Sequence, residues 1–158
     1  MFRSILKKKN ELDLDQSKRI LKNERRGVIA FNGDSGYPYA IPINYFYNEN
    51  ENKIYFHGAR IGYKVELLNK NNNVCFTVYG NEEFLDEQWD PFVSSVVVFG
   101  KCNIIQDRNK SLDMLKQFAC KYYPSEKMVE EEIQKSGNAV CMFEITIEHL
   151  SGKKVQEK

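Results

Sequence analysis

Residues 36–68 decide the fold, and they read GYPYAIPINYFYNENENKIYFHGARIGYKVELL. The pattern predicts two strands joined by the polar turn NENEN, then a short loop that leads directly into a helix. The loop is rich in small residues, and Lys64 follows where the helix begins. A helix N-terminus exposes backbone N–H groups, and a lysine beside them adds a positive charge. The stretch therefore predicts an anion site where the second strand passes into the helix.

Composition narrows the class of protein. The chain has 158 residues, of which 42% are hydrophobic, and this fits one domain over 1–158 with a core over about 13–153. Lys and Arg number 23 against 22 for Asp and Glu, so the net charge is only +1. Such a balanced charge gives no reason to expect a nucleic-acid partner.

The location of the protein is predicted from what its sequence lacks. The first residues, MFRSILKKKNELDLD, contain no apolar run of the kind found in a secretory signal. No window approaches the roughly 20 apolar residues of a membrane-spanning helix. The four cysteines stand singly without C-x-x-C spacing, which favours reduced thiols over a disulfide framework or a metal site. We therefore expect a cytoplasmic protein without a membrane partner or a bound metal.

The first third of the chain predicts a helix followed by a hairpin. Asp13 and Gln16 form a variant capping box for a helix over 13–26, which Gly27 can end, and its narrow apolar stripe suggests a surface position. The segment GVIAF is a strand, and NGDSG after it is a hairpin turn. The next strand contains Pro38 and Pro42, which cannot donate to a ladder, so it should lie at a sheet edge or carry a bulge.

The rest of the chain predicts four more strands and two long helices. Residues 81–92 are expected to be a loop or irregular helix, and the polar tail 151–158 is expected not to pack. Gly100 should mark a bend or bulge. The predicted strands are 53–58, 74–80, 93–106 and 139–150, and the predicted helices are 109–124 and 125–137.

Six strands with mostly antiparallel connections, and helices late in the chain, predict a mainly β fold with inserted helices. The preferred architecture is a small six-stranded antiparallel split β-barrel. The strand pattern by itself would also allow an open α+β sheet.

Several segments, taken in order, resemble the FMN-binding split-barrel family of pyridoxamine 5′-phosphate oxidase-like proteins. The resemblance covers roughly residues 13–153 and is greatest to the nitroimidazole-resistance branch. It implies a homodimer with two FMN sites at the subunit interface. The segments are GVIAF, GYPYAIPINYFY, KIYFHGARIGYKVELL, NNNVCFTVYG, SVVVFGKCNII and ITIEHLSGKK.

The resemblance implies that one strand runs along the edge of the isoalloxazine ring. Main-chain groups of this strand would meet the polar atoms of the ring, and the proline would keep the backbone out of a regular ladder. The matching residues are Ile41, Pro42, Ile43 and Asn44.

The resemblance also implies a group of residues around the ribityl phosphate. His57, Gly58 and Ala59 would supply amides and an imidazole. Lys64 would supply a point charge for the phosphate, and Ser95 would be a further contact. Taken singly, each has an ordinary explanation, because a lone histidine is more often a surface or core residue and GARIGYK is not a P-loop.

The sequence departs from the family at positions near the expected substrate. Related chains often carry a histidine where Tyr39 stands and a basic residue where Ser94 stands. The arginine run and the C-terminal pattern of true pyridoxamine phosphate oxidases are missing, so oxidation of vitamin B6 is not expected.

The resemblance implies an oxidoreductase that passes electrons from NADH or NADPH through FMN to a small electron-poor acceptor. The sequence itself identifies no catalytic acid or base. One alternative is a flavin-binding or redox-sensing module without turnover. Another is a haem-binding split barrel, for which His57 and His149 are the candidate ligands.

Overall fold

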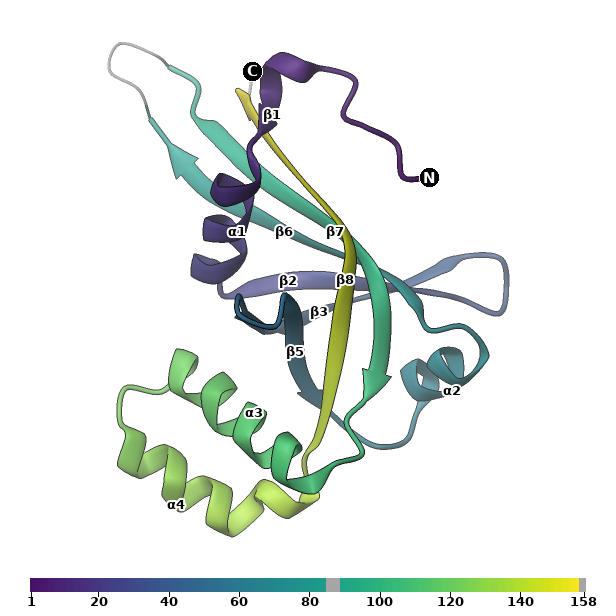
Figure 1. Cartoon of the computed structure of the whole chain (residues 1–158), viewed down its shortest axis with the longest axis vertical. Helices are drawn as coiled ribbons and strands as arrows, with labels where there is room; N and C mark the ends of the chain where they lie inside the picture. The colour runs from purple at the N-terminus through teal and green to yellow at the C-terminus, as the bar shows by residue number, and fades with distance from the viewer. Residues whose placement is uncertain (85–88, 157–158) are drawn as a thin grey trace.

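The computed structural model describes residues 1–84 and 89–156, and Figure 1 shows a strongly curled sheet with helices around it. Neighbouring strands are antiparallel and follow the order β3-β2-β6-β7-β8-β5-β4, with β1 paired to β8. The strands are β1 Glu11–Leu12, β2 Arg26–Asn32, β3 Pro38–Asn44, β4 Phe46–Asn48, β5 Lys53–Gly58, β6 Asn73–Glu83, β7 Phe92–Ile104 and β8 Cys141–Gln156.

The connection between β3 and β4 makes the sheet a barrel. The two strands lie at opposite ends of the strand order, yet they are separated in sequence by Tyr45 alone. The sheet must therefore curl until its two edges approach each other at this residue. This confirms the predicted split barrel and excludes the open sheet.

The predicted count of six strands was wrong, because the described residues form eight. The segment predicted as one strand over 37–47 is divided at Tyr45 into β3 and β4, which pair with different partners. The second additional strand, β1, has two residues, too few for an alternating pattern to be recognised. The position of β3 at the end of the strand order confirms the edge predicted from its prolines.

Alternation along the strands separates an inner from an outer face. On β2 the inward residues Ile29 and Phe31 are buried, whereas Val28 is exposed on the outer side. A second, smaller core forms on the outside of β5 and β8, where helix α3, Arg108–Tyr122, covers Tyr55 and Met142. The barrel therefore has an interior core and one helix-covered patch of outer wall.

Helix α1, Leu14–Asn23, begins at the predicted capping box, in which Asp13 and Gln16 bond to each other's backbone N–H. It ends three residues earlier than predicted, and Gly27 belongs to β2. The reason for a glycine there is packing, since a Cβ atom at that position would lie 2.4 Å from the Phe76 ring. The stripe of α1 is also not superficial, because Ile20 and Leu21 are buried in the barrel core.

The C-terminal segment was predicted to be too polar to pack on its own, and the predicted end of the last strand at Leu150 was wrong. Strand β8 continues to Gln156 and pairs with β7 as far as this residue. Figure 1 shows this end of β8 extending together with β6 and β7 beside β1. Backbone hydrogen bonds hold this part of β8, so polar side chains do not prevent it from forming a strand. Gly152 is buried, and a Cβ atom there would lie 2.1 Å from the Ser17 hydroxyl oxygen.

The remaining helices agree with the predictions within a few residues. Asp107 caps α3 and Ser125 caps α4. None of the helices in the described part of the chain is long and apolar enough to cross a membrane. Their bounds are α2 Tyr63–Lys70, α3 Arg108–Tyr122 and α4 Glu126–Ser136, with short 3₁₀ helices η1 Lys8–Asn10 and η2 Gly137–Ala139.

Two predicted irregularities are confirmed. The β2–β3 hairpin turns through Gly36, whose φ of 81° suits glycine. The register of β7 against β8 shifts between Phe99 and Gly100, which is the predicted bulge. Of the predicted loop over 81–92, residues 81–83 belong to β6, Phe92 begins β7, and 85–88 lie outside the described residues.

Replacing Gly152 tests whether the C-terminal half of β8 is packed. We expect Gly152→Ala to lower the free energy of unfolding by about 1–3 kcal/mol, because the added methyl group meets Ser17 and Leu12. Urea unfolding monitored by circular dichroism measures the change. Lys153→Ala, at the adjacent and partly exposed position, should alter stability by no more than about 0.5 kcal/mol. Equal midpoints for the two variants would mean that this segment is not packed.

Candidate functional site

The sequence predicts an anion site at the start of helix α2. Gly62 is its N-cap residue, with a φ of 112° and no atom within 4 Å of where a Cβ would lie. The Gly62 carbonyl accepts from the N–H groups of Val65 and Glu66. The N–H groups of Tyr63 and Lys64 lie ahead of these bonds and have no acceptor within the helix. The helix therefore presents backbone donors to open space.

Lys64 folds back from this helix across the end of β5. A Cβ atom built on Gly58 would lie 3.0 Å from the Lys64 Nζ atom, and the same ammonium lies 5.3 Å from the centre of the Phe143 ring. A side chain at this position would therefore require the end of the Lys64 side chain to shift slightly. The structure thus brings together the backbone of β5, the helix N-terminus and a lysine.

Arg60 adds a second positive charge that the sequence analysis did not single out. Burial raises the pKa of the Cys141 thiol, and the charges of Arg60 and Lys64 oppose that rise, which places both cations near the start of β8. Cys141 pairs directly with Gly58. The basic residue is visible in the segment GARIG, so the charge of this loop was the signal that could have identified it.

His57 lies next to Gly58, but its side chain is directed to the other side of β5. Its ring packs edge-on against Phe118 of α3, with 5.0 Å between the ring centres. His57 is exposed as a whole residue, but the packing of its ring partly desolvates it, and this desolvation, followed by the positive charge of Lys64, lowers the pKa of His57 below its ordinary value. The neutral imidazole is therefore favoured at neutral pH. Phe118 comes from a distant helix, so no sequence pattern could have shown this contact.

The predicted flavin-edge segment lies on β3, beside α2. Ile41 and Ile43 are partly buried against the barrel core, whereas Pro42 and Asn44 are exposed on the outer face. The residues alternate in this way because successive side chains of a strand point to opposite faces. The segment therefore offers a ligand the main-chain groups of an edge strand. It does not offer one continuous row of side chains.

Tyr39 connects this strand to the helix that carries Lys64. Its ring lies 4.9 Å from the ring of Tyr63, measured between centres, in an edge-to-face arrangement. The Tyr63 hydroxyl accepts a hydrogen bond from the Asp34 N–H at 3.3 Å. The tyrosine found where related chains often have a histidine therefore positions α2 against β3. Ala59 lies exposed in the loop that leads to this helix.

Ser95 does not join the other predicted residues within one chain. It pairs with Lys153 of β8, whereas His57 pairs with Met142, eleven positions earlier on that strand. Eleven residues of extended strand span roughly 35 Å. Ser95 does lie on the same outer face as Pro42, while its neighbour Ser94 is buried.

The remaining candidate groups are the cysteines and the second histidine. No group of His, Cys, Asp or Glu within residues 1–84 and 89–156 is arranged to hold a metal ion. Cys75, Cys102 and Cys141 lie in strands, as predicted, and burial raises the pKa of each thiol. The His149 ring is stacked on Phe2, with 4.8 Å between ring centres.

A curled antiparallel sheet whose two edges meet at Tyr45 defines a split-barrel protein. The family model for pyridoxamine 5′-phosphate oxidase matches residues 13–154. The chain therefore belongs to the pyridoxamine 5′-phosphate oxidase family. No curated protein matches it.

Solved structures share this fold at low sequence identity. A candidate 5-nitroimidazole antibiotic resistance protein from Bacteroides thetaiotaomicron is 21% identical with a TM-score of 0.75, covering 92% of this chain and 87% of its own. A FAD-binding protein from Mesorhizobium loti is 22% identical with a TM-score of 0.64, and the match covers 92% of this chain and 96% of that protein. The FAD and haem binding protein from Mycobacterium smegmatis is 16% identical with a TM-score of 0.71, and the match covers 92% of this chain and 72% of that protein.

The electrostatic effect of Lys64 on His57 is testable by titration. We expect Lys64→Ala to raise the pKa of His57, because the variant removes a positive charge that disfavours the imidazolium. Proton NMR of the imidazole signals measures the midpoint, and His149→Gln assigns the two histidines. Lys70→Ala, at the other end of α2, is the control. An unchanged His57 midpoint in Lys64→Ala would show that the ammonium does not lie near this ring.

Proposed function

We propose that the protein is an FMN-dependent oxidoreductase. The observation that carries the proposal is the position of Lys64, whose ammonium lies against Gly58 at the N-terminus of α2, in a chain that the family model matches over residues 13–154. Backbone donors, a helix N-terminus and a flexible ammonium are the groups that bind a phosphate dianion. The fold of the Mesorhizobium loti and Mycobacterium smegmatis proteins, both described as FAD-binding, supports a flavin as the carrier of that phosphate.

The residues present fit a flavin mononucleotide. The free N–H groups of Tyr63 and Lys64, with the ammonium of Lys64 and the guanidinium of Arg60, would hold the phosphate. Gly62 leaves this end of the helix open, since nothing lies within 4 Å of its missing side chain. The backbone of His57, Gly58 and Ala59 would lie along the ribityl chain.

The flat part of the cofactor would lie along β3. The segment Ile41, Pro42, Ile43 and Asn44 forms the edge of the sheet, and Pro42 interrupts its row of N–H groups. Tyr39 fixes this edge against α2 through Tyr63, and so it keeps the ring and phosphate regions at a constant separation.

When bound, FMN would supply the redox chemistry, accepting a hydride from NADH or NADPH and passing electrons to a small electron-poor molecule. The chain's own residues would bind and orient the cofactor and exclude water from one of its faces. The proposal assigns no residue of the chain as a general acid or base. A flavin-binding module without turnover is the alternative, and the assay below separates the two.

Lys64→Ala tests the phosphate site. We expect the variant to bind FMN roughly ten- to hundredfold more weakly, because a charge-assisted contact contributes about 1.5–3 kcal/mol. Binding of riboflavin, which lacks the phosphate, should hardly change. Titration followed by quenching of flavin fluorescence measures both ligands. Lys70→Ala, whose ammonium is 2.8 Å from Asp34, is the matched control on the same helix. An equal loss for FMN and riboflavin would remove Lys64 from the phosphate site.

A steady-state assay tests the reaction. FMN-loaded protein should oxidise NADH or NADPH in the presence of a nitroaromatic acceptor faster than the same concentration of free FMN does. The comparison with free FMN is needed because reduced flavin reacts with such acceptors without a protein. No acceleration by the protein would exclude the oxidoreductase and favour the module without turnover.

The proposed cofactor site is completed by a homodimer. The outer face of β2, β6 and β7 exposes Val28, Tyr79 and Phe99, whose side chains are 39%, 63% and 39% accessible. Ser95 lies on this same face, so a twofold partner would cover apolar surface and also place its Ser95 near the flavin.

A charge on this face should prevent the association. We expect wild-type protein to scatter light as a dimer and Val28→Asp to have the mass of the monomer, 18.5 kDa. Leu14→Asp places the same charge on an exposed position of α1 and should leave the dimer intact. Wild-type protein with the monomer mass and with FMN bound would contradict a shared site.

A further inference from the structure

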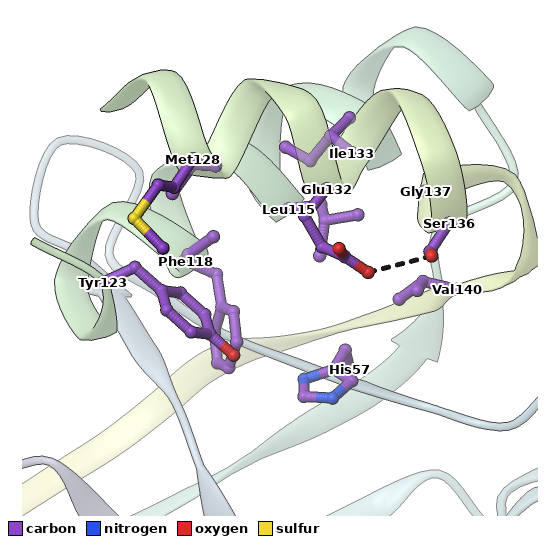
Figure 2. Close-up of a pocket in the computed structure, with 12 residues that line it drawn as sticks. His57, Leu115, Phe118, Tyr123, Met128, Glu132, Ile133, Ser136, Gly137 and Val140 are labelled. Atoms are coloured by element: carbon purple, nitrogen blue, oxygen red, sulfur yellow. Dashed lines mark hydrogen bonds between the residues drawn. The ribbon is translucent and has the colours of Figure 1, made fainter. Parts of the chain in front are cut away.

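A pocket of about 360 Å³ lies between helices α3 and α4 and the end of β5, and Figure 2 shows the residues around it. Its volume falls within the range of about 300–1,000 Å³ that is typical of sites for small organic ligands. The lining is predominantly apolar, as such sites usually are. The principal apolar residues are Leu115, Phe118, Met128, Val129, Ile133 and Val140.

The pocket exists because α4 is held by α3 rather than by the sheet. Val129 is the only residue of α4 that is buried, and an ion pair of 2.8 Å between Lys116 and Glu130 ties the two helices together. Ile133 packs only partly against the second core. Figure 2 shows α4 passing over the pocket and His57 on its opposite side, so the helix and the strand leave the space between them unfilled.

Few polar groups face this apolar space. The Ser136 hydroxyl donates to the Glu132 carboxylate at 2.9 Å, which uses its single O–H donor. Neither ring nitrogen of His57 has a hydrogen-bond partner in the part of the chain that the structure describes. The imidazole can therefore donate to a ligand, and a neutral imidazole offers one N–H donor and one acceptor.

Two rings make the pocket suitable for a flat molecule. Phe118 lines it from α3, and Tyr123 lies at its mouth with 59% of its side chain accessible. Met128 on α4, also at the mouth, can adapt to ligands of different outline because its side chain is flexible and polarisable. The carboxylate of Glu132 disfavours an anion, and the apolar walls disfavour any ion because burial removes its hydration.

We propose that this pocket binds a small, flat, uncharged aromatic molecule that accepts a hydrogen bond from His57. The site lies on the opposite side of β5 from the Lys64 ammonium, so its occupant and a bound phosphate do not compete for the same space. The proposal does not depend on turnover, because it rests on the α3–α4 pocket and on the unpartnered imidazole.

Coumarin is a suitable probe, because it is flat, uncharged and carries a carbonyl acceptor. Isothermal titration of flavin-saturated protein should show saturable binding of one coumarin per chain, and the His57 proton signal should shift on binding. Coumarin-3-carboxylate, which adds a negative charge to the same ring system, should bind at least tenfold more weakly. Naphthalene, which lacks the acceptor, should also bind more weakly and leave the affinity of the flavin unchanged.

A matched pair of variants on α3 tests whether coumarin binds in this pocket. Ala119 lines the pocket, so Ala119→Phe should fill it and weaken coumarin binding at least tenfold. Cys120→Phe adds the same ring at the next, exposed position and should have no effect. Met128→Asp, at the exposed mouth, gives a second test if Ala119→Phe does not fold. Binding that is unaffected by these pocket variants, unsaturable binding, or displacement of the flavin by coumarin would overturn the proposal.

Discussion

The packing of Tyr45 is the constraint on which the rest of the structure depends. The residue is completely buried, its hydroxyl donates to the Leu21 carbonyl at 2.7 Å, and its N–H donates to the Tyr122 hydroxyl at 2.8 Å. Its ring meets Phe76 edge-on and lies 4.1 Å from the Lys121 ammonium. One side chain thus joins α1, α3 and the sheet at the point where the two sheet edges meet. Burial beside these aromatic groups lowers the pKa of Lys121 to about 8.

The closure at Tyr45 also determines where the candidate site lies. Because β3 and β4 continue into each other, β3 is kept beside α2, and the end of β5 is brought to the start of the same helix. The backbone of β3, the Gly58 position and Lys64 then face one region at the edge of the barrel. The helical hairpin of α3 and α4 is attached to the other side of β5, where it contributes Phe118 and the pocket beneath α4. One strand therefore separates two regions of different chemistry.

Local signals predicted much of the fold. The capping box at Asp13, the edge strand at Pro42 and the bulge at Gly100 each depend on the chemistry of one or two residues, and they occur as expected. The division at Tyr45 and the packed segment around Gly152 could not be predicted in this way. They depend on contacts with α1, which lies far away in the sequence.

In the candidate site, too, local features could be predicted and features that depend on distant contacts could not. Lys64 and Gly58 are brought together by a short loop, so the segment that contains them was sufficient to predict an anion site. The orientation of the His57 ring depends on Phe118, and the position of Ser95 depends on the register of a long sheet. Neither is encoded near the residue itself.

The place of β8 in the sheet has a consequence for the speed of folding. This strand pairs with β1, β5 and β7 near the middle of the strand order, so the barrel needs contacts between segments that lie far apart in the sequence. Such pairings require long loops to close before they contribute free energy, and folds that depend on them form slowly. Until β8 is in place, the sides of β5 and β7 that it covers have no partner and can pair with another chain.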